Sequence, residues 1–307
     1  MGTATLVAVT TFAALMLQGG SDGGQRVEFD VNDARVASFG YVLQYDRYGS
    51  KAEAVAALAS SGCDLLVLDA FFSAGQPWTP ADLPDVRGDA GKVLLAYVSI
   101  GEAESYRDYW DEAWDADGDG APDAGAPAWL DEENPDWPGN YKVRYWDPAW
   151  QDVVLEYLAG VLVAGFDGAY LDVVDAYEYY EEGGRTTAAD EMVQLVSRIA
   201  NFCRSADGDF LVVPQNAEEL AFKPGYLDEV DGIGREDLLF TGDVKNPAVE
   251  RSEAECALEA FLKAGKFVLE VEYPTLANNA AACRSYARDM GYLLQVCPRG
   301  LDAVPAC

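Results

Sequence analysis

The 307-residue sequence contains no histidine. This absence excludes Ser-His-Asp and Cys-His catalysis, zinc sites with histidine ligands, and histidine proton shuttles. Any general acid or base in this chain must therefore be an aspartate, glutamate, tyrosine, lysine or cysteine.

Positive charge is also scarce, with 21 lysines and arginines against 53 aspartates and glutamates and a formal net charge of −32. Phosphate backbones and anionic lipids would repel such a chain, so we expect neither nucleic acid nor an anionic membrane as a partner. One explanation is a solvated acidic surface that favours solubility. The other is attraction of a cationic substrate such as an amino-sugar polymer.

Hydrophobic runs long enough to cross a bilayer are lacking. An uncharged apolar run covers residues 6–17, and a glycine-rich stretch follows it. We interpret residues 1–20 as an export signal-like segment, 21–37 as a linker and 38–307 as one domain, with no integral membrane span. The expected location is secreted or in the cell envelope.

The six cysteines lack the Cys-x-x-Cys spacing that is typical of metal sites. In an exported protein one to three disulfides would fit, and Cys297 with Cys307 is an obvious candidate pair. Buried free thiols are the alternative.

Strand-like and helix-like segments alternate along most of the chain. Eight such strands over about 260 residues predict an α/β fold, a (β/α)₈ TIM barrel in a single domain with an extended loop after strand three. A doubly wound open sheet is the alternative, although no glycine-rich phosphate loop follows the first strand. A ninth segment, 292–296, would be an extra terminal strand. The eight predicted strands are residues 39–43, 64–69, 92–100, 141–145, 166–172, 210–213, 230–234 and 267–271.

Acids and amides follow these strands at their C-terminal ends, which is where barrel active sites lie. Asp172 is placed to act as a nucleophile or base toward a sugar carbon, and Glu236 could be its partner carboxyl. Glu218 competes with Glu236 for the acid role. Aromatic residues could form stacking platforms for sugar rings. The candidate substrate-binding residues are Tyr41, Asp69, Glu102, Trp146, Asp175, Asn216, Glu218, Glu272 and Tyr273.

The extended loop carries a second motif. Asp115, Asp117, Asp119 and Asp123 place carboxylates at mostly alternating positions, with a glycine at the sixth, as in the first half of a calcium loop. The acid expected at the twelfth position is Ala126 instead. A structural Ca²⁺ is therefore one expectation, and an acidic turn without metal is the other; no cofactor is expected to be required for catalysis.

Four segments share a pattern with one enzyme family: residues 96–104 (AYVSIGEAE), 139–147 (GNYKVRYWD), 165–175 (GFDGAYLDVVD) and 214–216 (PQN). They resemble glycoside hydrolase family 114, in particular its longer branch of secreted bacterial and archaeal TIM-barrel proteins. The resemblance implies endo-α-1,4-polygalactosaminidase activity, which cleaves partly de-N-acetylated galactosaminoglycans. By motif, the family's two catalytic carboxylates would fall on Asp172 and Glu236.

The sequence thus predicts a secreted glycoside hydrolase that cleaves a polysaccharide or oligosaccharide with two carboxylates, and the family resemblance makes an α-1,4-linked galactosaminoglycan the candidate substrate. A barrel that binds carbohydrate without cleaving it is one alternative. A calcium-dependent structural protein is another.

Overall fold

A computed structural model describes residues 27–32, 34–89, 91–305 and 307. The export signal-like segment predicted at 1–20 lies outside the described residues. Within the part of the chain that is described, no helix combines the length and the apolar character that a membrane crossing would need.

The frame of the molecule consists of parallel strands in a five-stranded and a three-stranded sheet, eight in the described residues. The five-stranded sheet has the order β12-β11-β7-β4-β3 and the three-stranded sheet the order β13-β16-β17. The strands are β3 (Phe39–Val42), β4 (Leu65–Asp69), β7 (Val93–Ser99), β11 (Gly168–Asp172), β12 (Leu211–Pro214), β13 (Gly232–Glu236), β16 (Phe267–Glu272) and β17 (Leu293–Val296).

Two junctions join these sheets into a ring. A parallel bridge between Gln215 and Gly234 connects β12 to β13. At the other junction, the backbone N–H of Tyr41 in β3 donates to the side-chain oxygen of Gln295 in β17. The strands therefore form a (β/α)₈ TIM barrel, as the sequence predicts.

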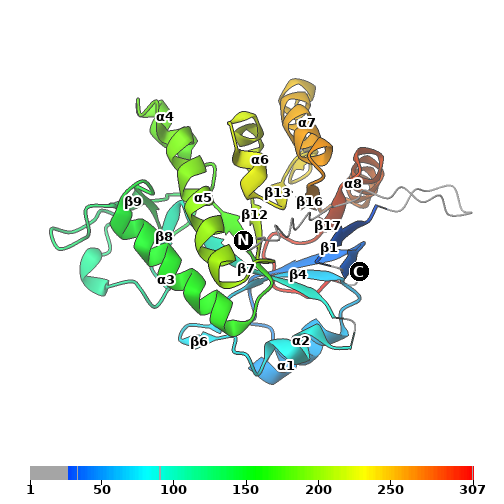
Figure 1. Ribbon diagram of the computed structural model, residues 1–307, viewed down its shortest axis with the longest axis horizontal. Coiled ribbons are helices and arrows are strands. Elements are labelled where there is room, and N and C mark those ends of the chain that lie inside the picture. The colour runs from blue at the N-terminus through cyan, green and yellow to red at the C-terminus, as the bar shows by residue number, and fades with distance from the viewer. Residues whose placement is uncertain (1–26, 33, 90, 306) are drawn as a thin grey trace, which may run out of the picture.

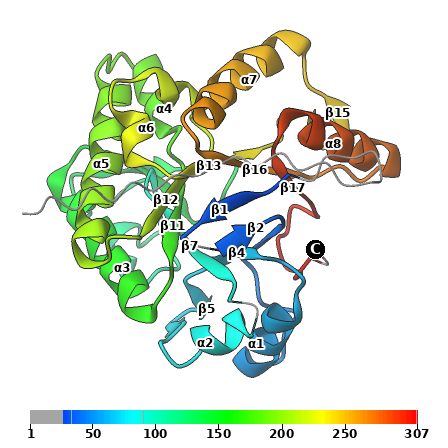
Figure 2. The ribbon, with the colours of Figure 1, turned by 45° about the vertical axis from the view of Figure 1, so that its right-hand side comes forward.

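Helices surround the strands, with α3 and α5 on one side, α7 and α8 on another, and α1 and α2 below (Figures 1 and 2). The helices are α1 (Lys51–Ser60), α2 (Leu83–Arg87), α3 (Pro148–Ala164), α4 (Ala176–Glu182), α5 (Ala188–Ala206), α6 (Tyr226–Glu229), α7 (Ala248–Lys263) and α8 (Ala277–Met290). Short 3₁₀ turns cover Glu112–Trp114 and Glu218–Phe222, and two small hairpins pair β5 (Phe71–Ser73) with β6 (Gln76–Pro77) and β14 (Phe240–Thr241) with β15 (Val244–Lys245).

Helix α3 shows how local sequence sets these boundaries. Asp147 accepts a hydrogen bond from the backbone N–H of Ala149 at 2.9 Å, and Pro148 occupies the first helical position, where its missing N–H costs nothing. Gly165 ends the helix with a φ of 93°, a conformation that glycine adopts without a steric penalty.

Part of the predicted linker is structured. Strands β1 (Phe29–Val31) and β2 (Ala34–Val36) form a hairpin at the N-terminal end of the barrel (Figure 2). Phe29 stacks on Phe267, with ring centroids 4.3 Å apart, and the Asn32 side chain donates to the backbone oxygen of Asp209. The folded domain therefore begins before residue 38.

The segment between β7 and α3 leaves the barrel and forms an antiparallel sheet of its own. Its strands are β8 (Glu102–Glu104), β9 (Leu130–Glu133) and β10 (Asn140–Val143), in the order β8-β10-β9. We call residues 101–147 the excursion. The predicted fourth barrel strand, 141–145, is wrong, because β10 belongs to this sheet. The predicted extra strand, 292–296, contains β17 and completes the barrel.

Alternate residues of the barrel strands pack into two different cores. In β16, Phe267, Leu269 and Val271 point into the barrel, while Val268 packs outward against the helices. In β11, Tyr170 points inward and Leu171 outward. This two-residue alternation decides which side chains at the strand ends can reach the mouth of the barrel.

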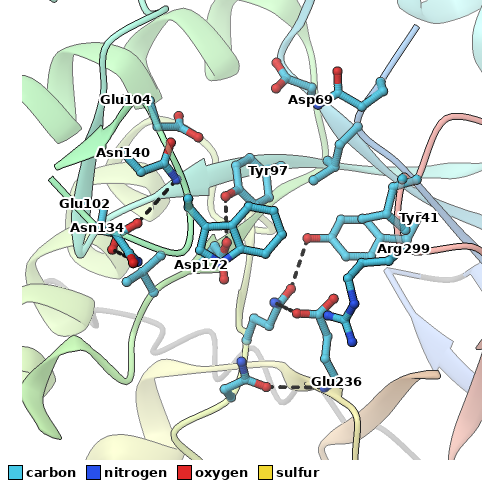
Figure 3. A pocket seen from close by; sticks show the side chains of 18 of the residues that line it. Tyr41, Asp69, Tyr97, Glu102, Glu104, Asn134, Asn140, Asp172, Glu236 and Arg299 are labelled. Atoms are coloured by element: carbon cyan, nitrogen blue, oxygen red, sulfur yellow. Dashed lines mark hydrogen bonds between the residues drawn. The ribbon is translucent and has the colours of Figure 1, made fainter. Parts of the chain in front are cut away.

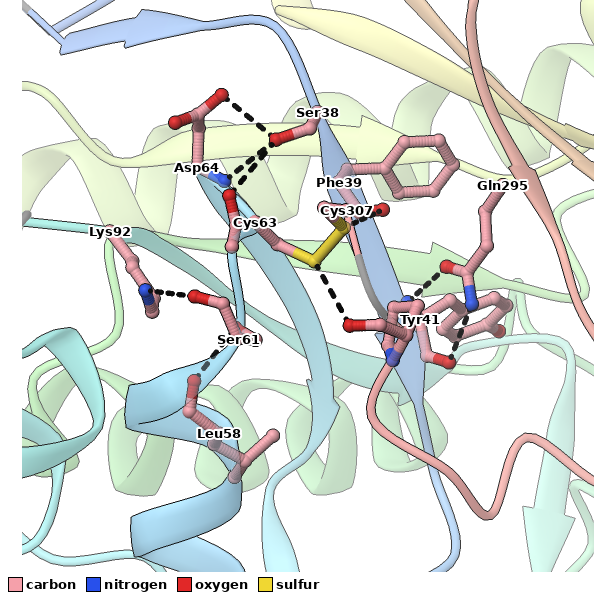
Figure 4. Close-up of a disulfide and its surroundings, with 12 residues drawn as sticks. Ser38, Phe39, Tyr41, Leu58, Ser61, Cys63, Asp64, Lys92, Gln295 and Cys307 are labelled. Atoms are coloured by element: carbon pink, nitrogen blue, oxygen red, sulfur yellow. Dashed lines mark hydrogen bonds between the residues drawn. A yellow bond between two sulfur atoms is a disulfide. The ribbon is translucent and has the colours of Figure 1, made fainter.

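The end of the chain is fastened to the barrel by a disulfide. Cys63, just before β4, is bonded to Cys307, 244 residues later (Figure 4). The preceding segment runs along β3, where the backbone oxygen of Leu301 accepts hydrogen bonds from the N–H groups of Leu43 and Gln44. The predicted pair Cys297–Cys307 is therefore wrong, and Cys297 is a free thiol together with Cys203, Cys256 and Cys283.

Candidate active site

A cavity of about 520 Å³ lies at the C-terminal ends of the barrel strands (Figure 3). Its lining includes Asp69 at the end of β4, Asp172 at the end of β11 and Glu236 at the end of β13. Tyr273 follows β16 and Asn216 follows β12. Most of the acids and amides predicted to gather at this face of the barrel line the cavity.

Asp172 is anchored by its neighbours on β7. Its carboxylate accepts a 2.6 Å hydrogen bond from the Tyr97 hydroxyl, and its backbone oxygen accepts one from Ile100 N–H at 3.0 Å. Burial raises the pKa of Asp172 to about 6, although the Tyr97 hydrogen bond opposes the rise. Asp172 is thus ionised near neutral pH and held in one orientation.

Glu236 is held by two side chains from neighbouring strands. The Tyr273 hydroxyl donates to one carboxyl oxygen and the Gln215 amide donates to the other. Gln215 in turn accepts a 3.1 Å hydrogen bond from the Tyr41 hydroxyl, which fixes the orientation of its amide. Burial, and then the charge of Asp172, raise the pKa of Glu236 to about 7. The two carboxyl groups are therefore close enough to interact electrostatically.

Tyr170 lies between these two groups inside the barrel. Its ring is fully buried and packs on Tyr41 at a centroid distance of 5.3 Å. A Cβ on Gly234 would lie 1.7 Å from the Tyr170 hydroxyl, so only glycine leaves room for this ring. Burial raises the pKa of Tyr170 most, and the charges of Glu236 and Asp172 raise it further.

Unusual backbone conformations gather at the same place. Val173 (φ 58°) and Asp237 (φ 51°) directly follow the two carboxylates, and Asn216, Ala217 and Leu301 also have positive φ. Among the described non-glycine residues, Asn32 is the remaining one with positive φ. Such conformations cost energy for residues with a Cβ, and they concentrate at functional sites.

Two arginines place positive charge in the cavity wall. Arg107 donates to both oxygens of Asp69 at 2.8 Å and to Glu104 at 2.5 Å, so the two acids share its single positive charge. Arg299 stacks over Tyr273, 4.2 Å from the ring centroid, and pairs with Asp237. The positive charge of Arg299 lowers the pKa of Glu236 against the effect of burial.

The excursion supplies the opposite wall of the cavity. Glu102 accepts hydrogen bonds from the side-chain amides of Asn134 (2.7 Å) and Asn140 (3.3 Å), and burial raises its pKa (Figure 3). Trp137 lines the cavity from the turn between these two asparagines and is 55 % exposed.

Most of the predicted site residues line this one cavity. They are Tyr41, Asp69, Glu102, Asp172, Asp175, Asn216, Glu236 and Tyr273. Burial and the nearby Asp172 charge raise the pKa of Asp175 to about 7. A strip of acids at the mouth is therefore only partly ionised at neutral pH.

Three predicted substrate-binding residues lie elsewhere. Glu218 is buried and paired with Arg235, with N···O 3.0 Å, and Glu272 accepts hydrogen bonds from the backbone N–H groups of Leu239 and Phe240. Trp146 packs under Arg185, whose guanidinium carbon lies 3.6 Å from the ring centroid. None of the three is part of the cavity lining that the described residues form. Glu218 therefore does not share the cavity of Glu236, and the choice between the two as the acid stays a prediction.

Several residues of the site were missed at the sequence level. In the sequence, Tyr97 looks like a core residue of β7. Gln215 lies between Pro214, which follows a predicted strand, and Asn216, which is itself a predicted site residue. Arg299 comes after the last strand, where no local pattern indicates that the chain returns to the mouth.

The acidic loop of the excursion lies away from the cavity. Asp115, Asp117 and Asp123 each offer an oxygen within 4.8 Å of the others, but Asp119 is not part of this group. Asp115 already accepts hydrogen bonds from three backbone N–H groups and from Tyr141, so the turn is well bonded without a cation. Carboxylate oxygens are the type of ligand that calcium prefers, but these three side chains supply only part of the ligands that the ion needs. Ca²⁺ binding therefore stays a prediction.

Chemically, the cavity offers two adjacent carboxyl groups whose pKa values lie near neutrality. One can be ionised while the other carries a proton, which is the arrangement that acid–base cleavage of a glycosidic bond requires.

Comparison with solved structures supports the same fold. The glycoside hydrolase domain of PelA from Pseudomonas aeruginosa superposes with a TM-score of 0.63 at 19 % identity, covering 88 % of this chain and 98 % of that domain. Aspergillus fumigatus Ega3, solved in complex with galactosamine, gives a TM-score of 0.65 at 17 % identity over 88 % of this chain and 94 % of Ega3.

Sequence comparison extends the relationship to bacteria and archaea. A protein of Deinococcus radiodurans is 41 % identical over 251 residues, which cover 80 % of this chain and 76 % of the relative. A Thermotoga maritima protein is 38 % identical over 70 % of this chain and 66 % of its own length. A Methanocaldococcus jannaschii protein is 40 % identical over 60 % of this chain and 53 % of its own length. The model of glycoside-hydrolase family GH114 matches residues 26–304, and the chain therefore belongs to this family.

Proposed function

We propose that this glycoside hydrolase cleaves a polysaccharide that contains amino sugars, with an α-1,4-linked galactosaminoglycan as the best candidate. Asp172 is the nucleophile or base and Glu236 the proton donor. The observation that carries this proposal is that both carboxyl groups face one cavity and that the charge of Asp172 raises the pKa of Glu236.

The pKa values support this division of roles. Asp172, with a pKa of about 6, loses its proton before Glu236, with a pKa of about 7. In the productive state Glu236 gives its proton to the glycosidic oxygen, while Asp172 attacks the sugar carbon or activates a water molecule. Tyr97 stabilises the charge on Asp172, and Gln215 and Tyr273 hold Glu236 toward the bond to be cleaved.

The charge of the cavity supports an amino-sugar substrate. Six acids line it, namely Asp69, Glu102, Glu104, Asp172, Asp175 and Glu236, whereas its lining cations are Arg107 and Arg299. A protonated amine would be attracted to such a site, and the chain as a whole carries a net charge of −32. The galactosamine bound to Ega3 is consistent with this substrate class.

An extracytoplasmic location is part of the proposal. The disulfide Cys63–Cys307 forms and persists most readily in an oxidising compartment. An enzyme outside the cell would also be able to reach a large glycan substrate.

The experiment is a glycan panel that includes α-1,4-galactosaminoglycan, assayed with the wild type, Asp172→Asn and Glu236→Gln. We expect each variant to lose at least about 10³-fold in turnover while still unfolding in one cooperative thermal transition. Asp152→Asn, the same change at an exposed position on α3, is the matched control and should keep full activity. Normal turnover in both site variants would contradict the assignment, and glycan binding without cleavage by the wild type would indicate a carbohydrate-binding barrel.

A further inference from the structure

We propose that Glu102 and Trp137 form a subsite, separate from the cleaving carboxylates, that binds one protonated amino-sugar unit of the polymer. The inference rests on the proposed function and adds the residues that distinguish a free amine from an acetylated one.

Glu102 is a buried carboxylate at the edge of the cavity, only 5 % exposed. One oxygen accepts a hydrogen bond from Asn134 and the other from Asn140. An ionised carboxylate offers about four acceptor positions, so each oxygen keeps a position for another donor. The two amides hold the carboxylate in place without neutralising it.

The other acids of the wall differ in this respect. Asp69 and Glu104 both form ion pairs with the single guanidinium of Arg107. Glu102 has no lysine or arginine nitrogen within 4 Å among the described residues. Lys142, its partner in the β8–β10 ladder, points its ammonium to Glu132 and to the face of Tyr179, and it lowers the pKa of Glu102 only from a longer distance. A buried carboxylate without a cation in contact is costly, and an incoming ammonium group would reduce that cost.

Trp137 is placed by the same turn that holds Glu102. Its backbone N–H donates to the oxygen of Asn134, and its backbone oxygen accepts from Asn140 N–H. The side-chain oxygen of Asn134 accepts a further bond from Asp136 N–H, so this amide can present only its NH₂ group to Glu102. The indole and the carboxylate are therefore positioned together by residues 134–140.

This pair matches two features of an amino sugar. An indole offers a flat apolar surface for the face of a pyranose ring, and a carboxylate accepts charge-assisted hydrogen bonds from its ammonium group. An N-acetylated sugar could still stack on the indole, but it carries no charge for Glu102. Selectivity for the free amine should therefore depend on Glu102, and general sugar affinity on Trp137.

The test measures binding by calorimetry in a Glu236→Gln background, where the ligand is not consumed. The ligands are galactosamine and N-acetylgalactosamine oligosaccharides of equal length. We expect the added Glu102→Gln change to weaken binding of the amine form about tenfold or more and to leave the acetylated form nearly unchanged. Trp137→Ala should weaken both ligands by similar factors.

Glu112→Gln is the matched control, because Glu112 belongs to the excursion, is exposed and lies outside the cavity lining. It should leave both affinities unchanged. An amine-to-acetyl affinity ratio that survives Glu102→Gln would overturn the subsite, as would equal effects of the Glu102 and Glu112 changes. Failure of the proposed function is a separate result, namely that the wild type cleaves no galactosaminoglycan.

Discussion

The two walls of the cavity are built in different ways. Asp172 and Glu236 stand at the ends of barrel strands, and their hydrogen-bond partners Tyr97, Gln215 and Tyr273 come from neighbouring strands of the same frame. The facing wall belongs to the excursion, where Glu102 receives its hydrogen bonds from the excursion's own turn.

Under the proposed function, this difference separates chemistry from recognition. The frame fixes the proposed reacting groups through backbone pairings shared by the whole barrel, so small changes there affect many contacts at once. The excursion holds Glu102 and its amide partners on a local sheet, while its apolar residues such as Trp129 pack in the main core. Changes in the frame should therefore act on the fold and on kcat, whereas changes in the excursion should act on substrate affinity.

The largest expected contrast comes from one alanine in each region. Gly234→Ala in the frame would bring a Cβ to 1.7 Å from the Tyr170 hydroxyl in a fully buried site. We expect a loss of about 3 kcal/mol or more in the free energy of unfolding, because this ring has no space to move. Gly125→Ala in the excursion has nothing nearer than 3.9 Å and should change stability by less than about 0.5 kcal/mol. Chemical denaturation of the two variants measures both effects. Equal losses in the free energy of unfolding would contradict the predicted difference between the frame and the excursion.

A smaller contrast separates two hydrogen bonds. Tyr97→Phe removes the donor to Asp172, and we expect kcat to fall by about 10- to 100-fold. Because that bond lowers the pKa of Asp172, its loss should also move the acidic limb of the pH profile upward. Asn140→Ala removes a donor to Glu102 and should raise KM while kcat stays within about twofold. Steady-state kinetics distinguishes the two, and a fall in kcat for Asn140→Ala would contradict the division.

The pH dependence follows from the frame carboxylates. Activity needs Asp172 ionised, which fails below about pH 6, and Glu236 protonated, which fails above about pH 7. We expect a narrow bell-shaped dependence of kcat/KM on pH, in which kcat/KM falls about tenfold for each pH unit beyond either limb. Glu102→Gln should lower the curve, and because the charge of Glu102 raises the pKa of Asp172, the acidic limb should move slightly downward. A pH-independent plateau extending to pH 9 would show that Glu236 is not the proton donor.

These raised pKa values also predict a stability effect. A carboxyl group whose pKa is higher in the folded state binds its proton more tightly there, so stability falls as the pH rises from about 4 through about 7. Replacing Glu236 by Gln removes this cost, and we expect the free energy of unfolding at pH 8 to rise by on the order of 1–3 kcal/mol. At pH 4 the variant should match the wild type. A variant that is less stable at pH 8 would contradict the assigned direction.

The smallest effect concerns the acidic loop. If Asp115, Asp117 and Asp123 bind calcium, millimolar Ca²⁺ should raise the melting temperature by a few degrees, and chelation should reverse the shift. Asp117→Asn should abolish the response. Turnover should stay unchanged, because this loop lies outside the cavity lining. A melting temperature insensitive to Ca²⁺ would leave the loop as an acidic turn.

Much of the frame could be predicted from the sequence, since runs such as 65–69 and 166–172 are apolar, short and finished by an acid. The excursion could not. The run 141–145 (YKVRY) alternates apolar and charged residues, which is typical of a half-exposed strand, but this alternation does not show which sheet the strand joins. The barrel strand at 292–296 ends in no acid, and the sequence predicts it only as an extra terminal strand.

The direction of side chains was the other limit. Because both faces of a barrel strand are buried, a continuous apolar run does not reveal which alternate residues point inward. Glu272 lies four residues after Val268 and therefore points to the same outer side of the barrel, whereas Tyr273, one residue later, reaches the cavity. Glu236 lies two residues after Gly234 and points inward as Gly234 does. Arg235, between them, points outward and pairs with Glu218.

The bond between Cys63 and Cys307 has a consequence for resistance to proteases. It closes a covalent ring that contains all barrel strands except β3, together with the whole excursion. A protease that cuts one exposed loop within this ring therefore releases no fragment, because the two new ends stay joined through the sulfur atoms. The cut enzyme can keep its strands in register, and a second cut is needed before a piece is lost.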